Sequence, residues 1–288
     1  MTARSRLGLA ACVFAALNGC VSPDASRGPQ CVAPANAGGG WDLTCRLTAQ
    51  VMGSLDLTSG AMRTLNMPGA GGGIAFAHTV GQRADDPNVI VAASPATTLR
   101  LAQGQYGHLS AEDVRWAAAV GAEYGIVAVA NDAPWTDLRS LLADWKADPS
   151  SIVVSGGSSV AGQDHMKMLL LARSAGISAR SVRYVAFDGG GEALTALLGG
   201  FVQVFSGEAS EVLGQLEAGD IRLLGVLAPE RLPGLLEQIP TATEQGFPVN
   251  WVTWRGFYVP GDVPDEAYDR WVDALRQVAE SDSWIAAR

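Results

Sequence analysis

The sequence predicts an α/β protein of two lobes joined by two crossing strands. A short apolar stretch, a loop rich in Gly or Ser and an amphipathic stretch follow one another repeatedly after residue 30. This order is typical of parallel strands that alternate with helices. Two apolar segments, 126–130 ("IVAVA") and 249–258 ("VNWVTWRGFY"), have no such loop after them, and they divide the repeats into an early and a late group. A chain of 288 residues is long enough for two such lobes.

The repeated unit occurs six times, at an irregular spacing that does not fit a solenoid. Its first copy runs from a strand at 31–35 through three glycines into a helix at 41–52. In chain order, the other strands are expected at 62–67, 89–93, 152–154, 182–187 and 202–205, with helices at 74–82, shortly after 98, and at 163–175, 194–198 and 211–218, and a last helix at 265–280. The lobes are then expected at 30–127 with 248–288, and at 128–247.

The first 20 residues read as an export signal. Arg4 and Arg6 give it a positive start, and 7–17 is an apolar run of 11 residues, too short for a bilayer span of roughly 20 residues. The next residues, "LNGC" at 17–20, resemble a bacterial lipoprotein cleavage box, so we expect lipidation of Cys20, with simple cleavage as the alternative. The mature protein is therefore expected in the periplasm, touching the membrane only through this anchor.

Charge and cysteine content narrow the partners and the compartment. The net charge is −9, and the chain has two lysines and no basic run, so nucleic acid is a poor partner. Cys31 is expected at the start of the first strand and Cys45 in the first helix. Because these two elements pack side by side and the compartment is oxidising, a disulfide between them is favoured, with two buried free thiols as the alternative.

The glycine-rich loops suggest an anion site. Ligands of parallel α/β sheets bind where strands end and helices begin, and a helix N-terminus offers unpaired N–H groups with partial positive charge. Glycine lets an anion approach those donors closely. The loops could instead be tight turns only. Three Gly clusters and two Ser/Thr loops, all at strand ends, favour the binding interpretation.

Enzymatic alternatives find less support. In "GAGGGI", Ile74 stands where the dinucleotide fingerprint needs its third glycine, and no P-loop lysine follows any loop. The three histidines have no metal-ligand spacing with another His or Cys. A serine hydrolase that uses Ser158 or Ser159 with His165 stays open as an alternative. We expect no catalysis, no metal and no cofactor.

Two side chains outside the loops have two interpretations each. Trp41 directly follows the first Gly loop, so it could close over a ligand or simply pack in the interior. Arg255, in "WRGFY", could pair with a ligand carboxylate, although a structural salt bridge near the hinge is the favoured interpretation.

Four motifs together resemble a known family. They are "APANAGGGWDLTCR", "NMPGAGGGIAFAH", "SGGSSVAGQDHM" and "VAFDGGGEALTALLGG", in this order along the chain. They look like the signature loops of the substrate-binding receptors of tripartite tricarboxylate transporters, also called the Bug family. The resemblance implies a type II periplasmic-binding-protein fold, in which two Rossmann-like lobes close on a ligand cleft. It also implies a di- or tricarboxylate ligand, citrate-like by the wording of the loops, and delivery to a two-subunit membrane permease.

The resemblance also implies the binding residues and the assembly. We expect a monomer, and a sensory protein that presents its closed form to a membrane kinase is an alternative that the sequence leaves open. Family members usually continue beyond the last helix, whereas this sequence ends at Arg288; a truncated sequence and a degraded paralogue of lower stability are the two alternatives. The implied ligand-binding residues are Ala37, Gly38, Gly39, Gly40, Asp42, Ala70, Gly71, Gly72, Ser94 and Thr97 in the first lobe, and Gly157, Ser158, Ser159, His165, Asp188 and Gly189 in the second.

Overall fold

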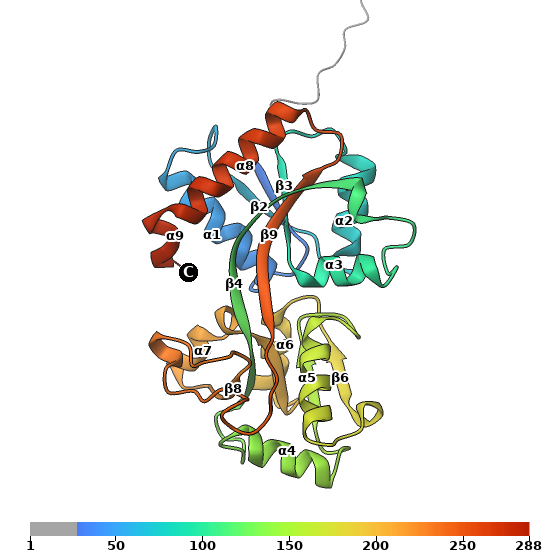
Figure 1. Cartoon of the computed structure of the whole chain (residues 1–288), viewed down its shortest axis with the longest axis vertical. Coiled ribbons are helices and arrows are strands. Elements are labelled where there is room, and N and C mark those ends of the chain that lie inside the picture. Colours follow the sequence, from blue (N-terminus) through green and yellow to red (C-terminus); the bar gives the residue numbers. More distant parts are fainter. Residues whose placement is uncertain (1–27, 288) are drawn as a thin grey trace, which may run out of the picture.

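The structure, a computed structural model, describes residues 28–287 (Figure 1). The expected export signal, with Cys20, lies outside these residues. The described chain forms two lobes stacked along the long axis (Figure 1). Strands β4 (Val114–Ala130) and β9 (Val252–Pro260) run side by side from one lobe to the other. The predicted α/β class is confirmed.

The upper lobe is built on three parallel strands. Strand β1 (Gln30–Ala33) lies between β2 (Arg63–Asn66) and β3 (Val89–Ala93), and β9 adds to β3 in the antiparallel direction. All residues of β1 and β3 are buried, as expected for parallel strands covered on both faces.

The lower lobe repeats this plan. Strand β5 (Val153–Gly156) lies between β6 (Arg183–Ala186) and β7 (Val204–Glu208), all parallel. Strand β4 pairs antiparallel with β7, and β8 (Ile221–Val226) pairs with the same end of β4. The complete order is β2-β1-β3-β9-β4-β7-β5-β6, with β8 beside β4.

Strand β4 belongs to both sheets. Residues 114–124 pair with β9, and residues 125–130 pair with β7 and β8. Its register shifts at three places, between Trp116 and Ala118, between Ala119 and Gly121, and between Val127 and Ala128. Such bulges increase local twist, which lets one strand turn from one sheet into the other.

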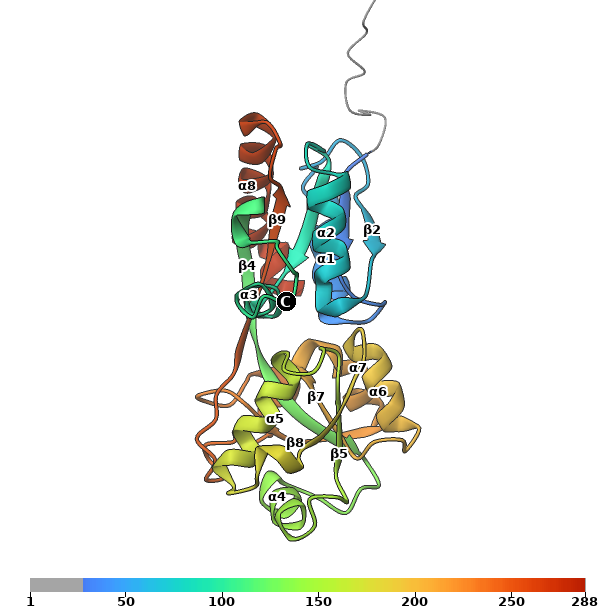
Figure 2. The ribbon, with the colours of Figure 1, turned by 90° about the vertical axis from the view of Figure 1, so that its right-hand side faces the viewer.

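Helices cover both faces of each sheet. In the upper lobe, α1 and α8 pack together on one face of the sheet and α2 covers the other face, which is the face turned toward the viewer in Figure 2 (Figures 1 and 2). None of the helices within residues 28–287 is long and apolar enough to cross a bilayer. The helices are α1 (Gly40–Ser54), α2 (Gly73–Gln82), α3 (Pro95–Ala102), α4 (Leu138–Ala147), α5 (Gln163–Ser174), α6 (Gly190–Leu198), α7 (Leu213–Ala218), α8 (Asp265–Glu280) and α9 (Asp282–Ala287).

Each lobe has its own hydrophobic core. Two clusters of buried side chains draw on residues 31–120 and 254–284 and fill the upper lobe. Two others draw only on residues 124–251 and fill the lower lobe. The predicted lobe boundaries, 30–127 with 248–288 and 128–247, stay a prediction.

The predicted disulfide is confirmed. Cys31 in β1 and Cys45 in α1 are bonded, with their Cα atoms 5.6 Å apart, and both are fully buried. The bond therefore ties the first strand to the helix that follows it, across the first Gly loop.

Several elements differ from the expectation. Helix α3 begins at Pro95, inside the predicted loop, because the Ser94 side chain accepts a hydrogen bond from the Ala96 amide and starts the helix there. Strand β4 begins 12 residues before the predicted segment at 126–130. Helix α4 and strand β8 were not predicted.

Candidate ligand site between the lobes

Six strand-to-helix loops meet where the lobes face each other. They follow β1, β2 and β3 of the upper lobe and β5, β6 and β7 of the lower lobe, at the carboxyl ends of the parallel strands. A Cβ atom added to Gly39 would lie 3.1 Å from the Gly189 Cα of the other lobe. The backbones of the two lobes thus approach each other at glycines.

Hydrogen bonds cross from lobe to lobe at several points. The Asn36 amide donates to the Asp188 carbonyl at 2.7 Å, and its side chain donates to the Glu192 carboxylate at 2.7 Å. The Arg100 guanidinium donates to the Val160 carbonyl at 2.8 Å and also to the Ser159 hydroxyl. The lobes are therefore closed on each other.

A cavity of about 30 Å³ lies between the closed lobes. This is room for a water molecule or two and not for a citrate, so the lobes must part for a ligand of that size to enter. Its lining comes from both lobes: Ala35, Gly40, Trp41 and Ala96 above, Gly157, Ser158, Gln163, Asp164, Gly189, Gly190, Glu208 and Glu211 below, and Arg255 on β9.

Some predicted site residues line this cavity or its neighbours. Gly40, Gly157, Ser158 and Gly189 line the central cavity. An adjoining cavity of about 10 Å³ is lined in part by Gly71, Ser158, Ser159 and Asp188, and a shallow depression beside it by Ala70. The structure thus gathers predicted residues from both lobes at one place.

Other predicted residues support the loops from behind. Asp42 accepts hydrogen bonds from the Gly38 amide at 3.0 Å and from the Asn66 and Arg46 side chains at 2.9 Å each. Burial raises the pKa of Asp42, but its bonds to Arg46, Gly38 and Asn66 outweigh this and hold the pKa below its usual range. The residues of this set, none of which lines the three cavities above, are Ala37, Gly38, Gly39, Asp42, Gly72, Ser94, Thr97 and His165.

The backbone donors of the two lobes differ in availability. The Gly38, Gly39 and Gly40 amides donate to Asp42, to the Asn36 carbonyl and to Glu211. Within residues 28–287, by contrast, the amides of four of the eight lower-lobe lining residues have no protein acceptor. They belong to Gly157 and Ser158, in the loop that follows β5, and to Gly189 and Gly190, at the start of α6. The lower lobe therefore offers the unpaired donors that an anion needs.

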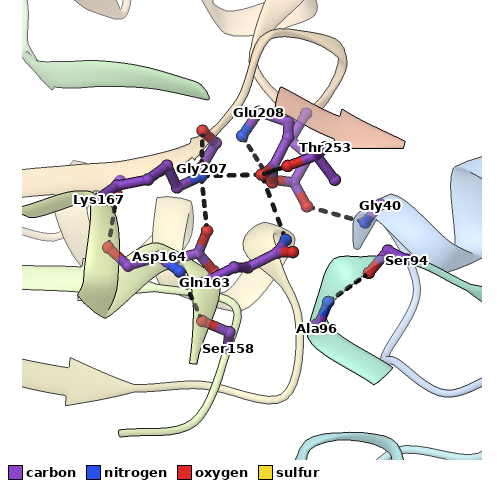
Figure 3. Close-up of polar contacts among 12 residues, drawn as sticks. Gly40, Ser94, Ala96, Ser158, Gln163, Asp164, Lys167, Gly207, Glu208 and Thr253 are labelled. Carbon is purple, nitrogen blue, oxygen red and sulfur yellow. Dashed lines mark hydrogen bonds and ion pairs between the residues drawn. The ribbon is translucent and has the colours of Figure 1, made fainter. Parts of the chain in front are cut away.

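A buried ionic cluster, which the sequence did not reveal, lies beside the cavity and lines it through Asp164 and Glu208; Figure 3 shows its polar contacts. Lys167 on α5 is fully buried, and its Nζ lies 2.8 Å from Asp164 Oδ1, from Glu208 Oε1 and from the Gly207 carbonyl. Glu208 Oε1 also accepts from Gln163 Nε2 at 3.2 Å and from Thr253 Oγ1 at 2.9 Å. The end of β7 is thereby fixed to α5 and β9.

Arg255 extends the cluster to the hinge. Its Nε donates to Glu123 Oε1 at 2.6 Å, and one terminal nitrogen lies 3.7 Å from Glu208 Oε2. The carboxylate of Glu211 bridges the lobes, since it accepts from the Gly40 amide at 2.8 Å and from the Glu208 amide at 3.0 Å. Ion pairing at Arg255 is the interpretation that the sequence favoured.

The pKa values of three carboxyl groups in this cluster differ from their usual values, and they are lowered in one case and raised in two. Burial raises the pKa of Glu208, but Lys167 and Arg255 outweigh burial and lower it overall. Burial, reinforced by Glu208, raises the pKa of Asp164 despite Lys167. Burial beside Glu208 and Asp164 raises the pKa of Glu211 to about 8. The cluster therefore holds protons at neutral pH.

Unpaired polar atoms gather around the same cavity. Within residues 28–287, eight buried side-chain nitrogen or oxygen atoms have no hydrogen-bond partner, and four of them belong to cavity-lining residues. Two are donors, Trp41 Nε1 and an Arg255 terminal nitrogen. The other two are acceptor oxygens: Gln163 Oε1, which has no partner, and Asp164 Oδ1, which has only its ion pair with Lys167. Buried polar groups are rarely left unpaired, so this concentration marks a place prepared for a polar ligand.

The structure does not bring a Ser–His pair together. His165 Nδ1 accepts from the Ala161 amide at 3.0 Å, and its ring stacks on Tyr184 with centroids 4.6 Å apart. Ser158 Oγ accepts from the Asp164 amide, and Ser159 Oγ accepts from Arg100. In residues 28–287, no group of three His, Cys, Asp or Glu side chains is placed to hold a metal ion.

Sequence signals for the missed residues were present but weak. Glu208 and Glu211 directly follow a strand in "SGEASE", the position at which the other loops were singled out. Lys167 is one of two lysines and lies on a helix that begins with a predicted site loop. Neither signal shows that these three residues come together, because their pairing joins α5 to the end of β7.

Two α/β lobes that close over a polar cavity lined by strand-to-helix loops define a periplasmic-type solute-binding protein of the two-lobed class. Residues 61–286 match the family model described as "Tripartite tricarboxylate transporter family receptor". The chain belongs to this family, as the motifs predicted.

Sequence relatives and solved structures agree with this assignment. The chain is 26% identical to Protein BugT of Bordetella pertussis over 247 residues, which cover 82% of this chain and 72% of the relative. It resembles the fold of R. palustris Rpa4515 with adipate (TM-score 0.82, 22% identity, 92% and 87% of the two chains covered). It also resembles MatC from Rhodopseudomonas palustris with bound malate (TM-score 0.78, 22% identity, 90% and 86% covered).

Proposed function

We propose that the protein is a periplasmic receptor that captures a small carboxylate between its lobes and delivers it to the two-subunit permease of a tripartite tricarboxylate transporter. The receptor binds and releases its ligand unchanged. The observation that carries this proposal is the concentration of unpaired polar atoms around one cavity between the lobes. The malate and adipate bound by the two R. palustris proteins support a carboxylate ligand.

The ligand carboxylate would bind to the lower lobe first. The unpaired amides of Gly189 and Gly190 lie at the start of α6, where the backbone carries partial positive charge, and those of Gly157 and Ser158 lie in the loop between β5 and α5. Contacts to Trp41 in the upper lobe and to Arg255 at the hinge can form only when the lobes are closed. A ligand that makes both sets of contacts shifts the population toward the closed form.

Titration calorimetry on the purified protein tests this function. The panel contains malate, succinate, adipate, citrate and glutamate, with glucose and benzylamine as ligands that lack a carboxylate. Saturable heat from at least one carboxylate, with the ligand recovered unchanged by NMR, is the expected result. Binding of glucose or benzylamine alone, or conversion of the ligand, would contradict the proposal. Uptake of the binding carboxylate by intact cells, lost on deletion of the receptor, tests delivery to the permease.

A further inference from the structure

The carboxyl groups around the cavity outnumber the cations, so the charges would not balance if every group were ionised. Four carboxylates form the ionic cluster, those of Glu123, Asp164, Glu208 and Glu211, but only two cations, Lys167 and Arg255, accompany them. In the adjoining cavity, Arg100 and Asp188 are of opposite charge and leave the balance unchanged. The central cavity is therefore more acidic than a site for a purely anionic ligand should be.

Both cations of the cluster are largely used within the protein. Lys167 directs its ammonium at Asp164, Glu208 and the Gly207 carbonyl, each at 2.8 Å. Arg255 pairs with Glu123 through Nε. A trianion such as citrate would bring three more negative charges to carboxylates whose two cations are already paired, in a poorly solvated place.

The unpaired atoms call for a ligand with donors as well as acceptors. Gln163, which is 6% exposed, has an unpaired acceptor oxygen, and Arg255, which is 8% exposed, has an unpaired donor nitrogen. Asp164 Oδ1 has only its ion pair with Lys167. A ligand made only of carboxylates would satisfy Arg255 and leave the Gln163 oxygen unpaired, at a cost of about 1–3 kcal/mol.

We propose that the ligand of this receptor carries a protonated amine beside its carboxylate, as an α-amino acid does. This inference rests on the proposed receptor function. The carboxylate would be held by the unpaired amides of the β5–α5 loop and of the start of α6, and the ammonium would lie against Gln163 Oε1 and the Asp164 carboxylate. The carboxylate of a zwitterion would then face the amide donors of the cavity, and its ammonium would face the acceptor oxygens.

Protons carry the excess charge when no ligand is bound. Burial beside Glu208 and Asp164 raises the pKa of Glu211 to about 8, so its carboxyl group is mostly protonated at pH 7. An ammonium placed beside these carboxyls favours their ionised forms and releases protons. A purely anionic ligand has the opposite effect and takes protons up. The direction of proton exchange therefore distinguishes the two kinds of ligand.

Matched pairs of ligands test the inference by titration calorimetry at pH 7. Each pair differs only in the amine: aspartate and succinate, glutamate and glutarate, norvaline and valerate. The amino acid of a binding pair should bind at least about tenfold more tightly, the ratio expected for one charge-assisted hydrogen bond. It should also release protons, seen as a dependence of the heat on the ionisation enthalpy of the buffer.

Two outcomes would overturn the inference, and they are distinguishable. Equal or tighter binding by the partner without the amine, or tightest binding by citrate, would refute the amine and leave the receptor function intact. No binding by any carboxylate, with or without an amine, would refute the proposed function together with the inference.

Variants separate ligand contact from general stability. Asp164→Asn should bring the affinity ratio of the pair to about one, while the partner without the amine keeps its affinity within about twofold. Gln163→Met, which also removes an acceptor, should lower the ratio in the same direction if Asp164→Asn does not fold. Asp132→Asn is the matched control, because Asp132 is an exposed carboxylate in the turn after β4. A variant that weakens both members of a pair equally would assign a structural role.

Discussion

Replacing Lys167 by Met should strongly destabilise the protein. The Lys167 side chain is fully buried and faces the carboxylates of Asp164 and Glu208, each 2.8 Å from Nζ. Methionine of similar length fills the space but leaves the buried Asp164 carboxylate without a cation and Glu208 with Arg255 alone, at 3.7 Å. Removing one partner of a buried pair costs about 3–5 kcal/mol. At roughly 2–4 °C per kcal/mol for a protein of this size, the melting temperature should fall by about 6–20 °C.

The pH dependence of this loss has a defined sign. Without the Lys167 ammonium, the pKa values of Asp164 and Glu208 should rise above their unfolded values, so the variant gains stability as the pH falls and protons bind. In the parent protein, Glu208 has a lowered pKa and gains nothing from protonation in that range, while burial raises the pKa of Asp164 and Lys167 limits that rise. The difference between the two proteins should therefore be larger at pH 8 than at pH 5.

Urea denaturation at both pH values, followed by circular dichroism, is the assay. Arg276→Met is the control, because Arg276 pairs with Asp273 at 2.6 Å on the surface, with the two side chains 62% and 60% exposed. This control should lose less than about 0.5 kcal/mol. A loss below about 1 kcal/mol for Lys167→Met at pH 8, or a loss that grows toward pH 5, would refute the reasoning.

Three further predictions concern the loops, the inter-lobe carboxyl and the disulfide. Gly71→Val should weaken ligand binding more than Ser158→Ala, because Gly71 has φ of 61° and a Cβ there would lie 2.5 Å from Ser159 Oγ of the other lobe; equal affinities by calorimetry would contradict this. Glu211→Gln should be more stable than the parent at pH 8 and equal to it at pH 5, measured by urea midpoints. Burial raises the pKa of this carboxyl from 4.5 to about 8, so the parent loses stability as the pH rises through this range. Cys45→Ala should cost about 3 kcal/mol, and dithiothreitol should lower the stability of the parent but not of the variant.

Much of the fold was predictable because many of its helices and strands have a recognisable local sequence pattern. The strand at 89–93 and the helix at 265–280 were predicted with the bounds that the structure gives. A compact apolar run and a regular amphipathic pattern depend only on neighbours in the chain. The first 12 residues of β4, "VRWAAAVGAEYG", were not predicted as a strand. This segment is half-exposed and interrupted by register shifts, so polar and apolar residues do not alternate regularly along it.

The candidate site was predictable in its backbone and not in its charges. Glycine loops at strand ends are visible in sequence, and the structure brings Gly40, Gly157 and Gly189 to one cavity. The ionic cluster cannot be recognised in the sequence, because Lys167 and Glu208 are 41 residues apart. The sequence also does not show whether a lysine is fully buried, as Lys167 is, or exposed to solvent. Such pairing is a property of the tertiary fold.

The passage of β4 and β9 between the lobes also imposes an order of folding. The strands of the lower lobe, β4 to β8, follow one another in the chain, so this lobe can form from one continuous segment. The upper lobe must wait for β9 and α8, and contacts such as the hydrogen bond from Trp271 to the Pro87 carbonyl join residues 184 positions apart. Long closures of this kind are slow. In a chain that emerges N-terminus first, the glycine loops of the upper lobe therefore appear early and become rigid last.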